Sequence, residues 1–150
     1  MRRLPWLRSH QKIVFLRLTF KTVSDPAPCC AVTLRRNIVI DWLNGIPQAA
    51  AELAQYKQAY ISPITWVEAQ VKAPPGLEDA TRQAIDANFK RIELDEATLI
   101  ESLNLRRSHR LKLPDAMIWA SARTHGWQLV TRNTKDFPPE WAGIRLPYTL

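Results

Sequence analysis

Residues 59–68 read AYISPITWVE, and this stretch decides the fold because it contains a complete strand-to-helix unit. The first three residues form a short apolar run that is typical of a buried strand. Serine followed by proline then marks a helix start, because serine is a favoured N-cap and proline a favoured first helical residue. We therefore expect a helix over residues 64–72, with Glu68 in its second turn.

The same alternation of strands and helices extends in both directions from this unit. Expected strands cover residues 31–34, 59–61, 91–94 and 128–131. Expected helices cover residues 38–43 (with Asn37 as N-cap), 48–58, 64–72, 77–89, 95–107 and 116–122. Strands that alternate with helices predict an α/β protein with a parallel sheet covered by helices, rather than a helical bundle or a β-sandwich.

The first segment of the chain differs from the rest in charge. The formal net charge is +7, and residues 1–36 hold eight basic side chains against one acidic, whereas from residue 37 onward 13 face 13. We interpret residues 1–30 as an atypical basic segment, disordered or mistranslated, and residues 31–150 as one domain. One hypothesis is a frameshift joined at Arg36 and Asn37. The alternative is that residues 31–34 form the central strand and the preceding residues are an appended arm.

The composition bounds the class of protein. A run over residues 13–20 alternates well enough to be a strand, but no apolar run approaches the roughly 20 residues that a membrane span needs. Cys29 and Cys30 are adjacent, which is poor geometry for a disulfide and too few ligands for a zinc site. We therefore expect a soluble, cytoplasmic protein without a membrane partner.

Acidic side chains follow the expected strands at positions that meet in a parallel sheet. Glu68 lies in the helix after one strand, Asp115 opens the helix over residues 116–122, and Asp136 follows the last strand. Ligands of such sheets bind outside the carboxyl ends of the strands. Carboxylates gathered there repel one another unless a cation lies among them, and oxygen ligands of this kind suit Mg²⁺ or Mn²⁺. A metal-activated water would then hydrolyse a phosphodiester without a nucleophilic serine or cysteine.

Four ordered blocks resemble the successive signatures of the PIN-domain family, and within it the VapC-like toxins. The blocks are NIVIDWLNG at 37–45, ISPITWVE at 61–68, LKLPDA at 111–116 and LVTRNTKDF at 129–137, followed by the terminal pair Pro147 and Tyr148. The resemblance implies a three-layer α/β/α fold and a Mg²⁺- or Mn²⁺-dependent endoribonuclease, commonly the toxin of a toxin–antitoxin module. It also implies an RNA substrate, a small antitoxin that wraps the acidic pocket, and a homodimer.

The resemblance assigns roles to particular residues. The implied catalytic residues are Glu68, Asp115 and Asp136. The implied metal ligands are Glu68, Asp115, Asn133 and Asp136, and the candidates for substrate binding are Thr65, Thr131 and Arg132. The four implied metal ligands also have simpler explanations. Asp115 can be a helix cap, Glu68 a solvated side chain, and Asn133 with Asp136 part of a turn.

One departure from the family pattern bears on activity. The family usually has Asp-Thr immediately before the asparagine of the first block, whereas this chain has Arg35 and Arg36, so the first strand and its aspartate are replaced. A guanidinium at Arg35 would pair with Glu68 or Asp115 and occupy the cation's place. Asp41, the nearest remaining acid, lies inside the expected helix and is a remote substitute.

Three readings of function follow from this departure. The first is a metal-dependent ribonuclease toxin impaired by loss of the first aspartate. The alternative is a catalytically inactive PIN-like protein that only binds an antitoxin or its own copy, and the substitution at Arg35 favours it. The third is a nucleic-acid-binding module that works through the basic residues 1–36.

Overall fold

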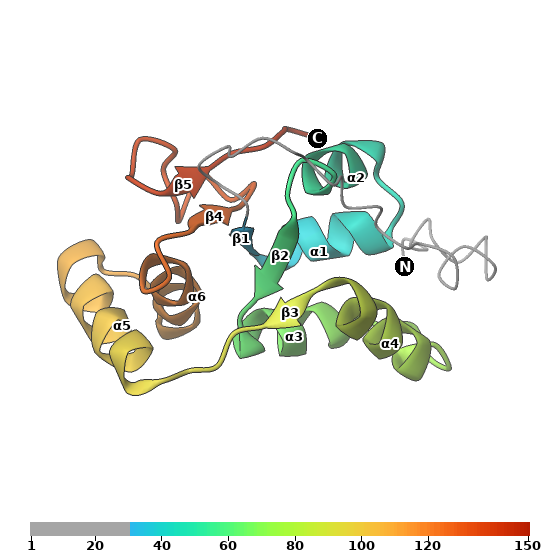
Figure 1. The fold of residues 1–150 in the computed structure, drawn as a ribbon, viewed down its shortest axis with the longest axis horizontal. Helices are drawn as coiled ribbons and strands as arrows, with labels where there is room; N and C mark the ends of the chain where they lie inside the picture. Colours follow the sequence, from blue (N-terminus) through green and yellow to red (C-terminus); the bar gives the residue numbers. More distant parts are fainter. Residues whose placement is uncertain (1–30) are drawn as a thin grey trace.

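The computed structural model describes residues 31–150, and within them five strands form one parallel sheet (Figure 1). The order across the sheet is β3-β2-β1-β4-β5. The strands are β1 Ala31–Leu34, β2 Gln58–Ile61, β3 Lys90–Arg91, β4 Gln128–Val130 and β5 Ile144–Arg145. The predicted α/β fold with a parallel sheet is confirmed, and residues 31–34 form its central strand. The predictions for residues 1–30, including the strand over 13–20, lie outside the described residues.

Six helices pack on the two faces of this sheet (Figure 1). They are α1 Arg36–Leu43, α2 Pro47–Leu53, α3 Pro63–Gln70, α4 Glu78–Asn88, α5 Glu96–His109 and α6 Leu113–Arg123. Successive side chains of a strand point to opposite faces of the sheet. Accordingly, Leu129 belongs to the apolar cluster with α5 and α6, while its neighbour Val130 belongs to the cluster with α1 and α2.

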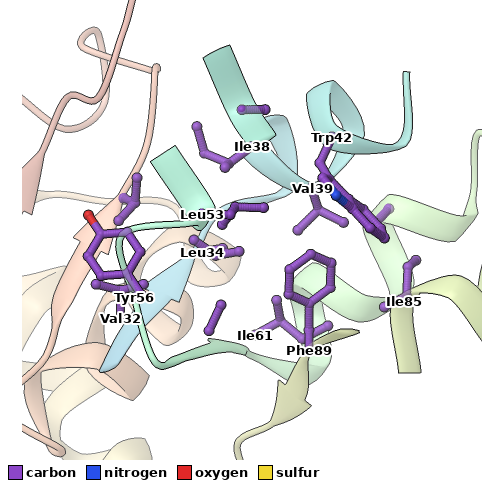
Figure 2. Packing of buried hydrophobic residues seen from close by; sticks show 14 residues of the cluster. Val32, Leu34, Ile38, Val39, Trp42, Leu53, Tyr56, Ile61, Ile85 and Phe89 are labelled. Carbon is purple, nitrogen blue, oxygen red and sulfur yellow. The ribbon is translucent and has the colours of Figure 1, made fainter. Parts of the chain in front are cut away.

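The larger cluster lies between the sheet and the first four helices (Figure 2). Its widest side chains are Trp42 from α1 and Phe89, which follows α4, and their rings meet edge to face with centroids 5.0 Å apart. Trp42 is 1% exposed, so the indole contributes its full apolar area to the core. None of the helices in residues 31–150 is both long and apolar enough to cross a bilayer.

Several element boundaries differ from those predicted. The helix predicted over residues 48–58 ends at Leu53, and the strand predicted over 91–94 covers only residues 90–91. The prediction of Asn37 as the N-cap of α1 was wrong, because Arg35 is the N-cap and makes no side-chain capping bond. The strand β5 was not predicted, since two residues are too short to show a strand period.

A buried carboxylate ties α2 to the last strand. Glu52 is 4% exposed and accepts hydrogen bonds from Nε and Nη2 of Arg145 at 2.6 and 3.0 Å, and from the Tyr56 hydroxyl at 2.5 Å. Burial raises the pKa of Glu52, but these hydrogen bonds outweigh burial and hold the pKa below its usual value. The pair fixes β5 at the edge of the sheet.

Replacing Glu52 by glutamine tests this tether through the pH dependence of stability. The folded-state pKa is lowered, so the carboxylate stabilises the fold above its ordinary pKa of about 4.3 and this contribution is lost as the pH falls through the folded-state pKa. We expect E52Q to unfold more easily at pH 7, by about 2 kcal/mol, and to lose less stability than the parent below pH ~4. Urea unfolding across pH measures both, with the exposed Glu140→Gln as control; parallel pH profiles for E52Q and the parent would contradict the assignment.

Candidate active site

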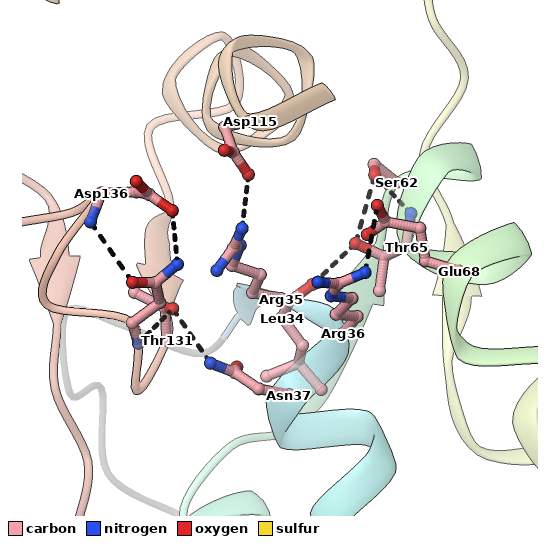
Figure 3. Close-up of polar contacts among 11 residues, drawn as sticks. Leu34, Arg35, Arg36, Asn37, Ser62, Thr65, Glu68, Asp115, Thr131 and Asp136 are labelled. Atoms are coloured by element: carbon pink, nitrogen blue, oxygen red, sulfur yellow. Dashed lines mark hydrogen bonds and ion pairs between the residues drawn. The ribbon is translucent and has the colours of Figure 1, made fainter. Parts of the chain in front are cut away.

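The candidate site lies at the carboxyl edge of the three central strands (Figure 3). Leu34 at the end of β1 is in register with Ile61 of β2 and Val130 of β4. The residues that follow these strands are therefore brought to the same edge, and the backbone N–H of Arg35 donates to the carbonyl of Val130 at 3.1 Å. This register explains why Leu34 and the start of α3 meet although they are distant in sequence.

A buried ion pair occupies the centre of this edge. Nη2 of Arg35 donates to Oδ1 of Asp115 at 2.5 Å, and each of the two side chains is only 8% exposed. The guanidinium also lies over the ring of Phe137, 5.2 Å from its centroid. Nε of Arg35 is buried and has no hydrogen-bond acceptor among the described residues. The predicted pairing of Arg35 with an acid is therefore observed, and its partner is Asp115.

The second arginine pairs with the second acid. Nη1 of Arg36 lies 3.5 Å from Oε1 of Glu68, and these side chains are 45% and 27% exposed. This pair is more exposed to solvent and longer than the first, so it is weaker. Two successive arginines thus neutralise two of the three carboxylates that the sequence assigned to catalysis.

Thr65 connects α3 to the central strand. Its Oγ1 donates to the carbonyl of Leu34 at 3.3 Å, and its backbone N–H donates to Oγ of Ser62, the N-cap of α3, at 3.1 Å. Thr65 is fully buried. These contacts hold Thr65 at the helix start, and its role in substrate binding stays a prediction.

Asn133 and Asp136 form a local turn after β4. Nδ2 of Asn133 donates to Oδ2 of Asp136 at 2.6 Å, and the backbone N–H of Asp136 donates to Oδ1 of Asn133 at 3.3 Å. Thr131 Oγ1 accepts from the Asn133 backbone at 3.0 Å and from Nδ2 of Asn37 at 3.4 Å. The turn therefore uses all three predicted residues in hydrogen bonds to one another or to α1.

Arg132 points to a different acid. Its Nε and Nη2 donate to the two carboxylate oxygens of Asp41 at 2.5 and 2.9 Å, and the Tyr148 hydroxyl donates to Oδ2 of Asp41 at 2.9 Å. Burial and the bond to Asp41 raise the pKa of Tyr148, so the phenol remains a donor. Asp41 is thus committed to this network through both carboxylate oxygens. The sequence blocks contained all three residues but gave no signal that they pair.

The donors present do not fit a divalent ion as they stand. Within residues 31–150 no group of three or more histidine, cysteine, aspartate or glutamate side chains is arranged to hold a metal. Asp115 and Asp136 line one cleft of about 320 Å³, but Glu68 is not among its lining residues. The guanidinium of Arg35 supplies the positive charge that a cation would otherwise bring to Asp115.

Comparisons with known proteins agree on the fold. Residues 34–138 match the family model of the PIN domain. A chain of the "Toxin-antitoxin complex from Klebsiella pneumoniae" is 38% identical with a TM-score of 0.74, and the match covers 79% of this chain and 99% of that one. A comparison with curated proteins gave no match.

Two further structures share the fold at low identity. A chain of FitAcB from Neisseria gonorrhoeae is 17% identical with a TM-score of 0.62, covering 79% of this chain and 99% of that one. A chain of FitAB bound to an IR36 DNA fragment is 18% identical with the same TM-score, covering 79% and 96%. At these identities the likeness supports the fold alone.

The two neighbouring arginines allow a matched stability test. Arg35→Met leaves the Asp115 carboxylate buried without its counter-ion, so we expect the free energy of unfolding to fall by about 3 kcal/mol. Arg36→Met removes only the exposed pair and should cost less than about 1 kcal/mol. Urea unfolding of both variants measures the difference. Equal losses for the two variants would show that the Arg35 pair has no special weight.

Proposed function

The chain belongs to the PIN domain family. We propose that it is a VapC-like toxin that binds an antitoxin. We also propose that it has the fold of a metal-dependent endoribonuclease, in which Arg35 occupies the place of the metal ion. The observation that carries this proposal is the buried Arg35–Asp115 ion pair. The expected outcome is a protein that binds its partner without cleaving RNA.

The toxin assignment is supported by the 38% identical chain from Klebsiella pneumoniae described above. Its structure is of a toxin–antitoxin complex, and the match runs along nearly the whole of that chain. From this relative we carry over to this chain an antitoxin as protein partner. A second copy of itself as dimer partner and action in the cytoplasm are proposed from the family resemblance.

The nuclease part of the proposal concerns the centre that remains once the arginine is removed. Glu68, Asp115, Asp136 and the amide of Asn133 would then be the oxygen donors available to Mg²⁺ or Mn²⁺, with RNA as substrate. A metal bound there would activate water for phosphodiester hydrolysis. Among the predicted substrate-binding residues, we assign positioning roles to Thr65 and Thr131, because their hydroxyl groups are buried in hydrogen bonds within the protein.

The structure favours the non-cleaving form for the chain as it stands. A guanidinium paired with Asp115 supplies a positive charge but cannot bind and activate a water molecule as a metal ion does. A divalent ion would have to displace this buried group before it could reach the carboxylate. We therefore assign the binding function to the chain with Arg35, and ribonuclease activity to a variant in which the family's aspartate is restored at this position.

Restoring the family residues tests the proposal directly. The double variant Arg35→Asp, Arg36→Thr is expected to cleave a mixed RNA substrate in the presence of Mg²⁺ or Mn²⁺ and to be silent in EDTA, because it removes both guanidinium groups and adds a carboxylate. The parent chain should be silent in both conditions. Adding Asp115→Asn to the double variant is the matched control and should abolish cleavage. Metal-dependent cleavage by the parent at the rate of the double variant would show that Arg35 does not close the centre.

An apolar surface on α5 and α6 supports the dimer part of the proposal. Aliphatic side chains that are about half exposed lie along this surface, from α5 and the start of α6: Leu99, Ile100, Leu103 and Leu113. Leu99, Leu103 and Leu113, together with Met117, border a groove of about 440 Å³. Such a patch marks an interaction site, and a second copy would bring the same aliphatic groups to it.

Charging this surface should separate the copies. We expect Leu103→Glu to shift the protein from dimer to monomer, because a carboxylate would be buried against apolar groups at the interface. The control is Val71→Glu, an exposed aliphatic residue at the end of α3. Light scattering coupled to size exclusion gives the mass of each variant. A monomeric parent, or a dimer that survives L103E, would remove α5 and α6 as the dimer surface.

A further inference from the structure

We propose that the cleft between the α5–α6 connection and the β4–β5 connection binds a phosphate of single-stranded RNA without any metal ion. This inference deepens the proposed function, because it names the ligand that the closed centre still accepts. It rests on the side chains that line the cleft and on the neutralisation of Asp115 by Arg35.

The cleft has three cations at its mouth. Arg110 and Lys112 lie in the connection between α5 and α6, and Lys135 lies between β4 and β5. All three are exposed, and none forms an ion pair with a residue in the part of the chain that the structure describes. Free cations from two separate loops that face one cleft of about 320 Å³ are suited to a phosphate group.

The backbone decides which basic side chains reach the cleft, and closeness in sequence does not. The basic run over residues 106–112 is divided by the end of α5, where Arg110 adopts the left-handed conformation with φ of 55°. Arg106, before this turn, borders the apolar groove of α5 and α6, whereas Arg110 and Lys112, at and after it, line the cleft. The turn therefore directs part of the run to the cleft.

Two acids, Asp115 and Asp136, also line the cleft and would repel a phosphate. Asp115 is already neutralised by Arg35 at 2.5 Å. Asp136 accepts a hydrogen bond from the uncharged amide of Asn133. The remaining balance is three free cations against one carboxylate without an ion-pair partner among the described residues, so the cleft attracts anions.

The wall of the cleft suits the rest of a nucleotide. Leu111, Pro138 and Trp141 form its apolar part. The Trp141 ring is stacked on Trp119, with centroids 5.1 Å apart and planes 8° from parallel, and it meets His109 edge to face at 4.5 Å. A fixed, partly exposed indole beside cations is the combination by which proteins bind single-stranded nucleic acids without reading their sequence.

The test is the binding of a short, fluorescein-labelled single-stranded RNA of mixed sequence to the full chain in EDTA, followed by anisotropy over a range of salt concentrations. The variant Lys112→Gln, Lys135→Gln should bind roughly tenfold more weakly, and the slope of log K against log salt should fall by about 0.7, the contribution of one phosphate contact to a single strand. The matched control, Lys12→Gln, Lys21→Gln, removes the same charge from the basic first segment and should change neither quantity.

A second readout reports the cleft itself. RNA should quench tryptophan fluorescence in the parent, and Trp141→Phe should remove most of that quenching. An unchanged affinity and salt slope in K112Q/K135Q would overturn the proposal, and so would binding that is lost only in K12Q/K21Q. Because no metal is present and no cleavage is measured, these outcomes are independent of whether the Arg35→Asp, Arg36→Thr variant is a ribonuclease.

Discussion

The parallel pairing of β1 with β2 on one side and β4 on the other is the constraint on which the site depends. Leu34 is in register with both Ile61 and Val130, so the residue after β1 must lie at the centre of the carboxyl edge. The backbone bond from Arg35 to Val130 holds it there. Whatever side chain stands at this position is therefore placed beside Asp115, and its charge sets the chemistry of the edge.

The Arg35–Asp115 ion pair fills the centre of the edge but adds little to the stability of the fold. Transferring two charges into a buried site is costly, and the attraction between them offsets this cost only when the hydrogen bonding is complete. Here one bond joins Arg35 to Asp115, and the buried Nε has no acceptor among the described residues. The fold gains little from the pair compared with an apolar core of the same size, but removing one partner leaves the other charge uncompensated.

Sequence reasoning reached the α/β fold because four strands and six helices have clear local patterns, such as Ser62 and Pro63 before α3. Family resemblance combined with charge predicted that Arg35 pairs with Glu68 or Asp115, and the structure shows that its partner is Asp115. Sequence reasoning missed β5, because a two-residue strand has no period and is defined only by its neighbours. It also missed the pairing of Asp41 with Arg132, which are 91 residues apart, since no local pattern links residues so distant in sequence.

Where the family usually has an aspartate this chain has Arg35, a difference of two units in local charge. Asp115 lies at the edge and pairs with this cation, while Arg110, Lys112 and Lys135 line the same cleft. In an acidic centre those three cations would hold substrate phosphates beside a metal. With Arg35 paired to Asp115, the cleft has one carboxylate, that of Asp136, without an ion-pair partner among the described residues. The two proposals made above, a centre closed to metal and a cleft that binds phosphate, therefore both follow from the charge at this one position.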